Sequence, residues 1–373
     1  MVSYLKLKSW ISIILTLIII SIMIFYLGGP LEIIENISLI NPLFFIITAV
    51  LFTIDIILRA IRWNILLKAQ LKEEFHNKKI RFRDLILPMY SSAFINLVTP
   101  ARAGDAVRLY VLHEEHELEY SAGLSVIVVE QIVTLFSLLI VGFLSLLIMF
   151  PGIQNNSSNE ILELINTALP VVLLGYFLGT LAILFLFLVD ARKFIPLFEI
   201  FPFPEKLMAF IRSFLTSFSS GSKGLRESPI QFIGALIVSS LGWIIEGAMI
   251  WFFSIELIDP NFEIEIATFA SVMGNFTFVV PLLPGAMGFY EAIIGVCLAL
   301  SPLWSTSGES NAILIAVVDR AVKTATLLIL GGWATIQLQV QNLQRQKIIE
   351  EAKTEEKVEE AVIFEDSNLQ NDK

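Results

Sequence analysis

A polar stretch that follows a short apolar run carries the side chains of this sequence that are best suited to chemistry. It contains Asn96, Arg102, Asp105 and Arg108, and a proline and a glycine interrupt it. The apolar run before it has about 14 residues, fewer than the roughly 20 that a membrane-crossing helix needs. Irregular backbone at membrane depth is tolerated only beside protein or a water-filled cavity. We therefore predict a re-entrant loop that faces a polar cavity.

The two arginines of this stretch have the chemistry of a phosphate site. Each guanidinium is a planar fork of donors that matches phosphate oxygens, and the amino ends of short helices add partial positive charge. The phosphate of a phospholipid or of a polyprenyl-linked lipid would fit Arg102 and Arg108, with Asn96 and Asp105 beside it. The alternative for Arg108 is a side chain that only extends to the cytoplasmic interface.

Further charged residues lie inside apolar segments. An ionised side chain in hydrocarbon is costly, so such residues face the interior of a helix bundle or water and pair with one another. Any one pair could simply lock two helices together, but the spread of these charges over several segments favours a shared polar cavity. The residues expected to line or gate this cavity, or to bind the headgroup, are Glu130, Glu246, Glu291, Asp319 and Arg320.

A second apolar segment is broken near its middle. The run at residues 266–280 is interrupted by a Pro/Gly passage and resumes at Glu291, which gives two half-length helices. Within this passage, Pro284, Gly285 and Gly288 are expected to line the cavity. A carboxylate at the start of the second half-helix would also cap free amides and interact favourably with the helix dipole, and capping alone is the alternative role for Glu291.

Composition places these residues in a membrane protein. With 56% hydrophobic residues and a mean hydropathy of +0.77, the chain has too few polar residues to cover a water-soluble globule. The long apolar runs lack the two-residue alternation of outer-membrane strands. We therefore predict an all-α, polytopic membrane protein. The net charge of -10 comes largely from the carboxyl-terminal tail and the polar loops, so no nucleic-acid partner is expected.

About six full transmembrane helices are predicted, together with two re-entrant broken-helix hairpins. The predicted full spans are residues 10–27, 41–58, 122–149, 169–189, 230–253 and 311–336. Basic residues concentrate in the loop at residues 59–83, which includes Arg59 and Arg62, and in the loop at residues 190–226. The positive-inside rule places both loops in the cytoplasm. The first hairpin then dips from the cytoplasm and the second from outside, an opposite orientation like the inverted broken helices of transporters.

This topology predicts a multi-pass protein of the cell membrane with both termini in the cytoplasm. Residues 1–340 are expected to form one transmembrane domain. The tail at residues 341–373 is charged and nearly devoid of aromatic residues, so we expect a solvated helix that becomes partly disordered. It offers a surface for a soluble partner, and a homo-oligomer is also open. No phosphate-binding loop, dinucleotide fingerprint or nucleophile elbow occurs in context, so no cofactor and no metal is predicted.

Several motifs together carry a family resemblance. They are the run Arg59-Ala60-Ile61-Arg62-Trp63, the stretch at 96–108 that resembles Pro-x-Arg-x-Gly-(Glu/Asp)-x-x-Arg, Glu130, the passage at 281–291 that resembles Pro-Gly-Gly-x-Gly-x-x-Glu, and Arg320. In these motifs the chain resembles the lysylphosphatidylglycerol synthase transmembrane-region family, a flippase-like membrane domain that also occurs as stand-alone proteins. The resemblance covers most of residues 10–340. It implies two re-entrant broken helices and lipid or lipid-linked substrates.

The chain departs from the family pattern in places. Where the family has Glu-Arg with an Asp one turn later, this sequence has Glu130-Gln131 and Thr134, and Ala286 replaces a glycine. A proton relay through that Asp is therefore not implied. The aminoacyltransferase domain of the family is large and soluble, and the tail is too short to contain it, so synthase activity is not expected.

Three functions remain open from the sequence. The preferred one is a lipid translocase, in which a phospholipid or polyprenyl-linked headgroup crosses through the polar cavity while the lipid tails stay in the bilayer. The main alternative is a membrane-embedded glycosyl- or phosphotransferase that acts on a polyprenyl phosphate. Such enzymes place acidic metal ligands in an outer loop close to the first helix, where this chain offers only Glu32 and Glu35. The third is a subunit that recruits a soluble partner through its tail.

Overall fold

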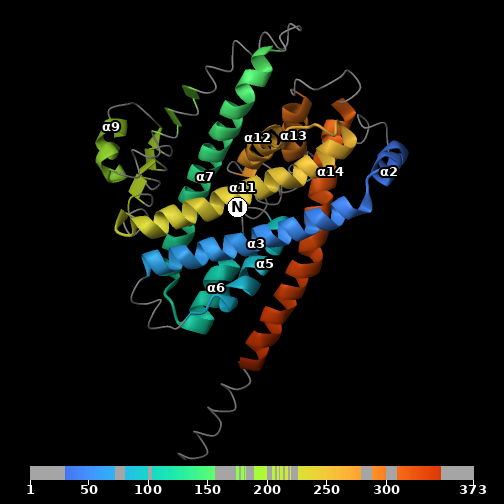
Figure 1. The fold of residues 1–373 in the computed structure, drawn as a ribbon. Coiled ribbons are helices and arrows are strands. Elements are labelled where there is room, and N and C mark those ends of the chain that lie inside the picture. Colours follow the sequence, from blue (N-terminus) through green and yellow to red (C-terminus); the bar gives the residue numbers. More distant parts are fainter. Residues whose placement is uncertain are drawn as a thin grey trace, which may run out of the picture.

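The computed structural model is helical throughout the part of the chain that it describes (Figure 1). The described residues are 30–71, 80–99, 103–155, 226–278, 288–299 and 309–345, with short pieces between 174 and 219. The predicted span at residues 10–27 lies outside them, as do most of the span at 169–189 and the tail beyond residue 345. The all-α class of a polytopic membrane protein is confirmed.

Three long helices form the centre of the bundle. They are α3 (Pro42–Gln70), α7 (Tyr120–Asn155) and α11 (Pro229–Leu257), and each contains a segment long and apolar enough to cross a membrane. The side chain of Asn41 caps α3 by accepting a hydrogen bond from the Leu43 amide at 3.0 Å, and a proline follows in the first turn. α11 packs along α3, and α7 packs against both.

Helix α3 is longer than the sequence predicted. The predicted span ended at residue 58, and Arg59 and Arg62 were assigned to a cytoplasmic loop. That assignment was wrong, because α3 continues to Gln70 and the side chain of Arg62 is buried. The helix can continue through two arginines because each finds a carboxylate inside the bundle, which offsets part of the cost of burying the charge.

Two pairs of short helices lie at opposite ends of this bundle. The first pair is α5 (Arg83–Val98) and α6 (Asp105–His116), and the second is α12 (Ile264–Asn275), which ends in the 3-10 turn η3 (Phe276–Phe278), and α13 (Phe289–Ala299). In Figure 1 the first pair lies below α3 and the second lies at the top. The two pairs of short helices lie where the sequence predicted broken segments, and their opposite orientation across the membrane stays a prediction.

The last described helix runs the whole height of the molecule. α14 (Glu309–Thr326) continues through a π-helical segment, η5 (Leu327–Gly331), and then as a helix to residue 345. Its upper part packs against α13, and η5 packs against α5, so this helix connects the two broken pairs. Smaller described elements are α2 (Pro30–Ser38), η2 (Ala191–Phe194) and α9 (Ile195–Glu199).

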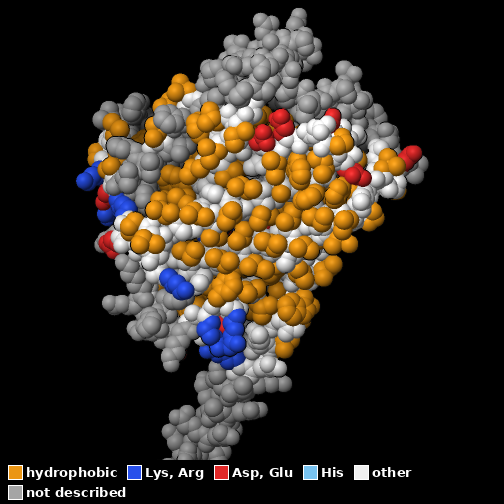
Figure 2. Space-filling view, in the orientation of Figure 1, with side chains coloured by type: hydrophobic (Ala, Val, Ile, Leu, Met, Phe, Trp, Pro, Cys, Tyr) orange, Lys and Arg blue, Asp and Glu red, His pale blue; other side chains and the backbone are white. Residues whose placement is uncertain are grey.

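The outer face of the bundle is apolar. Figure 2 shows a wide band of hydrophobic side chains, with the Lys and Arg of this face at its left and lower edges and only acidic charges at its upper right. Exposed aliphatic side chains recur at helical spacing along α3 and α11. They are Leu43, Ile46, Val50 and Ile54 on α3, and Ile230, Ile233, Ile237, Leu241 and Ile244 on α11. Contiguous apolar surface of this extent is typical of a face that contacts lipid.

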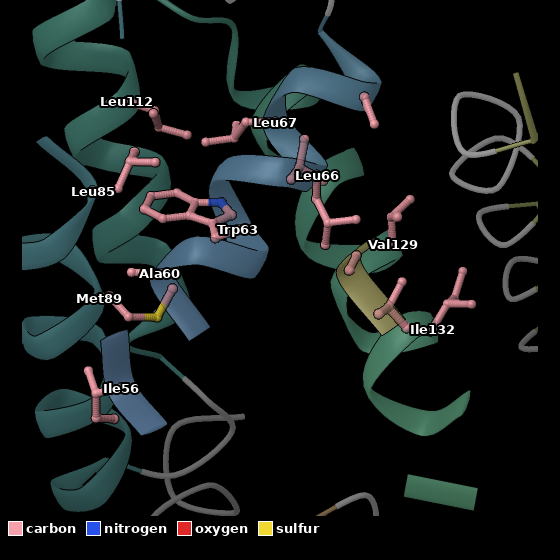
Figure 3. Packing of buried hydrophobic residues seen from close by; sticks show 14 of the residues in the cluster. Ile56, Ala60, Trp63, Leu66, Leu67, Leu85, Met89, Leu112, Val129 and Ile132 are labelled. Atoms are coloured by element: carbon pink, nitrogen blue, oxygen red, sulfur yellow. The ribbon is translucent and has the colours of Figure 1, made fainter. Parts of the chain in front are cut away.

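Trp63 anchors the first broken pair to the bundle. Only 1% of this residue is exposed, and Figure 3 shows its ring beside Leu85 and Met89 of α5, with Leu112 of α6 nearby. On the other side of α3, Leu66 points toward α7. The short helices are therefore held by apolar packing as well as by their polar side chains.

Close contact between α11 and α12 depends on Gly247. A Cβ atom at this position would lie 2.5 Å from the Cα of Thr268. We expect Gly247→Ala to lower the free energy of unfolding by about 1–3 kcal/mol, because the two backbones must move apart. Thermal unfolding of the purified protein in detergent measures the effect.

The matched control is Gly332→Ala, a helical glycine with open space around its missing side chain. This change should leave the melting temperature unchanged or raise it, since alanine is a better helix former by about 1 kcal/mol. Equal melting temperatures for Gly247→Ala and the parent protein would contradict the packing argument.

Candidate functional site

Helix α3 carries two arginines, about one turn apart, into the interior of the bundle. A guanidinium nitrogen of Arg59 lies 2.8 Å from Glu246 of α11, and one of Arg62 lies 2.8 Å from Glu130 of α7. Each arginine thus begins a separate cluster of charged side chains, and both clusters are anchored on the same helix.

The Glu130 cluster consists of Arg62, Arg108, Asp105 and Glu130. The carboxylate of Glu130 uses one oxygen for Arg62 and the other for Arg108, at 2.8 and 2.6 Å. Arg108 also lies 2.8 Å from Asp105, and its guanidinium carbon is 5.2 Å from the centre of the Trp63 ring. Arg108 and Glu130 are 2% and 3% exposed. Two positive and two negative charges therefore balance in a desolvated setting.

A hydrogen-bonded turn holds Asp105 and Arg108 in place. The amide oxygen of Asn96 accepts a hydrogen bond from the Gly104 amide at 2.8 Å, and its nitrogen lies 3.4 Å from Asp105. Only glycine fits at position 104, because a Cβ atom would collide with the carbonyl oxygen of Ser92. Asn96 therefore fixes the start of α6, and Arg108 projects from its first turn.

A chain of hydroxyl groups extends the Glu130 cluster. The second terminal nitrogen of Arg62 donates to Ser239 at 2.8 Å, and Ser239 lies 2.6 Å from Ser137. The indole of Trp243 donates to Ser137 at 2.9 Å. Polar contacts thus connect α3, α7 and α11 inside a bundle whose outer face is apolar.

The Glu246 cluster consists of Asp55, Arg59, Glu246, Lys323 and Asp319. Arg59 binds Asp55 at 2.7 Å and Glu246 at 2.8 Å. The ammonium of Lys323 lies 2.8 Å from Glu246 and 2.9 Å from Asp319. The cluster is therefore a row in which carboxylates and cations alternate, and it ties α3, α11 and α14 together.

A third ion pair adjoins this row. One oxygen of Glu291 accepts a hydrogen bond from the Gly288 amide at 2.6 Å, and the other lies 3.3 Å from Arg320. Gly288 has a φ of 86°, which favours glycine. Glu291 thus caps the start of α13 and pairs with a cation. Tyr290 lies between this pair and the row, since Arg320 lies over its ring and its hydroxyl is 3.1 Å from Asp319.

The structure groups most of the predicted site residues, but into three adjoining sets. Asn96, Asp105, Arg108 and Glu130 meet in the first set, Glu246 and Asp319 in the second, and Glu291, Gly288 and Arg320 in the third. Arg102, Pro284 and Gly285 lie outside the described residues.

The sequence prediction missed four charged members of these sets. They are Asp55, Arg59, Arg62 and Lys323. Two of the pairs had a recognisable signal, because Asp55 with Arg59, and Asp319 with Lys323, are opposite charges four residues apart on a helix. Extending the predicted span at residues 41–58 by about one turn would have brought both arginines into the bundle.

The arrangement favours an anion as the bound species. The side chain of Arg59 is 35% exposed, while the other cations of the two clusters are at most 11% exposed. Arg59 can therefore contact a ligand without first leaving its carboxylates. Across the described part of the chain, His, Cys, Asp and Glu side chains form no group of three that could hold a metal ion.

Comparison with known proteins places the chain among membrane proteins. The family model described as the lysylphosphatidylglycerol synthase TM region matches residues 10–331. Glycosyltransferase AglD of Haloferax volcanii is 27% identical over 352 residues, which cover 88% of this chain and 54% of that protein. The UPF0104 membrane protein MJ1078 of Methanocaldococcus jannaschii is 25% identical over 240 residues, covering 64% and 92%. This chain therefore spans about half the length of AglD. No solved structure matches it.

Neutralising Glu130 tests the central ion pairs. In Glu130→Gln, Arg62 and Arg108 lose the carboxylate that they share, and a buried charge left without its partner costs about 3–5 kcal/mol. We expect a clearly lower melting temperature in detergent. Glu199→Gln, which removes an exposed partner of Arg212, should leave it unchanged. Similar melting temperatures for the two variants would contradict the importance of these pairs.

Proposed function

Because this chain belongs to the lysylphosphatidylglycerol synthase TM region family, we propose that it is a lipid translocase. It moves the headgroup of a phospholipid or a polyprenyl-linked lipid through the polar interior of its helix bundle while the lipid tails stay in the bilayer. The observation that carries the proposal is the set of charge clusters anchored at Arg59 and Arg62 of α3, inside a bundle whose outer face is apolar.

The number of buried charges supports a transport path over simple helix adhesion. Replacing a buried ion pair with well-packed apolar residues is often neutral or stabilising. Helices in a membrane can associate through small residues and packing alone, as α11 and α12 do at Gly247. Charged residues kept in three adjoining sets therefore point to a ligand that carries charge.

A phosphate group can enter these clusters by replacing a carboxylate. In the proposed cycle the phosphate first contacts the exposed side of Arg59 and then takes the place of Asp105 on Arg108, close to Asn96. Arg102, which lies outside the described residues, is proposed as a further ligand of the phosphate. The carboxylates that this releases pair again with neighbouring cations. The groups that line the path and change partners during this cycle are Glu130, Glu246, Glu291, Asp319 and Arg320.

The two broken helix pairs supply the alternating openings. Transporters with inverted broken helices bind their substrate near the midplane and open first to one side and then to the other. Here the Pro/Gly passage with Pro284, Gly285 and Gly288 serves the outer opening, and the turn at Gly104 serves the cytoplasmic one. With these openings we propose that the protein lies in the cell membrane and has both termini in the cytoplasm.

A second candidate function comes from the similarity to AglD, a protein named as a glycosyltransferase. On this alternative the chain transfers a sugar or phosphate group to or from a polyprenyl phosphate. A metal-dependent assay with a labelled sugar nucleotide or a polyprenyl-linked sugar distinguishes the two. Product formed by the purified chain would favour the transferase, and lipid movement without product would favour the translocase.

Lipid movement in proteoliposomes tests the role of Arg59. A fluorescent anionic phospholipid is incorporated, and its arrival in the other leaflet is followed by chemical quenching. In Arg59→Gln the phosphate loses a charged donor, worth roughly 1.5–3 kcal/mol, so the rate should fall about tenfold or more. Arg59→Lys keeps the charge but loses the planar fork, and should be slow as well.

The matched control is Arg83→Gln, an exposed arginine at the start of α5. Its rate should equal that of the parent protein. The Arg59 variants and Arg83→Gln are compared with the parent protein at equal amounts of folded protein, as judged by gel filtration. Parent-like rates in both Arg59 variants would overturn the proposed path.

The proposed orientation predicts which loops are accessible from outside. In a Cys297→Ser background, Asn261→Cys lies in the loop between α11 and α12, and Glu119→Cys lies between α6 and α7. A membrane-impermeant maleimide added to intact cells should label the cysteine at 261 and reach the one at 119 only after permeabilisation. Labelling of both positions from the same side would rule out this topology.

A further inference from the structure

The Glu246 cluster contains one carboxylate more than it has cations. Its order is Asp55, Arg59, Glu246, Lys323, Asp319, with each cation between two carboxylates at 2.7 to 2.9 Å. The side chains of the three acids are at most 5% exposed. With every group ionised, the cluster carries a net charge of -1 inside the membrane, which is costly.

Neighbouring cations are engaged with acids of their own. Arg320 pairs with Glu291, and Arg62 and Arg108 are balanced by Glu130 and Asp105. Neutral polar side chains also face the row, namely Asn275, Tyr290 and Tyr90. Within the described residues, therefore, the extra negative charge has no neighbouring positive charge to balance it.

Asp319 is the member of the row that is least suited to remain ionised. The residue is fully buried, and one of its carboxyl oxygens has no hydrogen-bond partner. Its other oxygen accepts from Lys323 and from the Tyr290 hydroxyl. Lys323 is shared with Glu246. A carboxylate oxygen in an apolar interior loses its hydration, and without a hydrogen bond nothing offsets that loss, so the ionised form is costly. Binding a proton neutralises the group and removes this cost.

The geometry of the row suits a proton better than a metal cation. The acids of the row alternate with Arg59 and Lys323, so they do not converge on a common point, and the described side chains form no group that could hold a metal ion. A proton needs one carboxylate oxygen only. Because the acids of the row interact with one another through the shared cations, their protonation is coupled and one proton neutralises the row as a whole.

We propose that the Glu246 cluster is a proton-binding site, and that Asp319 carries the proton at neutral pH. The proton comes from water and adds to the carboxylate of Asp319, which becomes a neutral acid, and its release restores the ion. With Asp319 neutral, the charge of Lys323 balances that of Glu246 alone, and the row has no net charge. When the proton is released, Lys323 has to balance two carboxylates, Glu246 on α11 and Asp319 on α14.

Infrared spectroscopy of the purified full chain tests the site without any transport. In a detergent free of ester groups and at neutral pH, the parent protein should show a carbonyl band of a protonated carboxyl group that shifts in D2O. Asp319→Asn leaves two carboxylates and two cations, so the band should disappear completely. Glu256→Gln, which removes an exposed acid of the same helix as Glu246, should keep it.

A parent protein without this band, or a folded Asp319→Asn variant that keeps it, would overturn the proposal. If Asp319→Asn does not fold, Tyr290→Phe serves instead, because it keeps every charge and removes one hydrogen bond to Asp319. Its band should change frequency. An unshifted band would place the proton on another acid and would also overturn the assignment.

A consequence for transport rests on the proposed translocase function. If lipid movement is coupled to this proton, a pH gradient across proteoliposomes should change the transport rate of the parent protein and leave that of Asp319→Asn unaffected. The proton site and the translocase function can be disproved independently of each other. The infrared band reports proton binding even if no lipid moves, and lipid movement without the band would leave the translocase intact and remove the proton site.

Discussion

The architecture depends on one electrostatic constraint, which is that a charge inside an apolar bundle must find its opposite charge. Arg59 and Arg62 lie on the central membrane helix α3 and would be prohibitively costly there without Glu246 and Glu130. Each carboxylate in turn holds a second cation from another helix. The positions of α3, α7, α11 and α14 are therefore coupled through ion pairs, and a displacement of one helix strains more than one pair.

Apolar packing makes this arrangement specific. Trp63 fills the space between α3 and the short helices α5 and α6, and it lies beneath the guanidinium of Arg108. Glycines at 104, 247 and 331 permit close approaches that any side chain would prevent, the last of them where η5 meets α5. Because such contacts allow little adjustment, the charged groups are held at fixed distances, and a change in their pairing requires a movement of the helix that carries one of the partners, such as the short helix α6 with Asp105 and Arg108.

Such a bundle is suited to exchange partners with a charged ligand. In the Glu130 cluster the charges balance, so an entering phosphate replaces the interaction between Asp105 and Arg108, while in the Glu246 cluster a proton neutralises the one carboxylate in excess. Broken helices at both ends provide segments that can move while the long helices stay in place. A lipid headgroup path and a proton site on the same helices would then share Glu246 and Lys323, which gives a direct physical means of coupling.

The sequence by itself determined the membrane class, the two broken segments and part of the set of charges that lie inside, without Asp55, Arg59, Arg62 and Lys323. Hydropathy, the Pro/Gly interruptions and the cost of burying a charge were sufficient for these, and Asn96, Asp105, Arg108 and Glu130 were recognised in this way. Only the tertiary structure decided which charge meets which. Arg62 and Glu130 are 68 residues apart, and Arg59 and Glu246 are 187 apart. A local measure of hydropathy counts an arginine as polar whatever its partner, so it ended α3 before the two arginines that organise the interior.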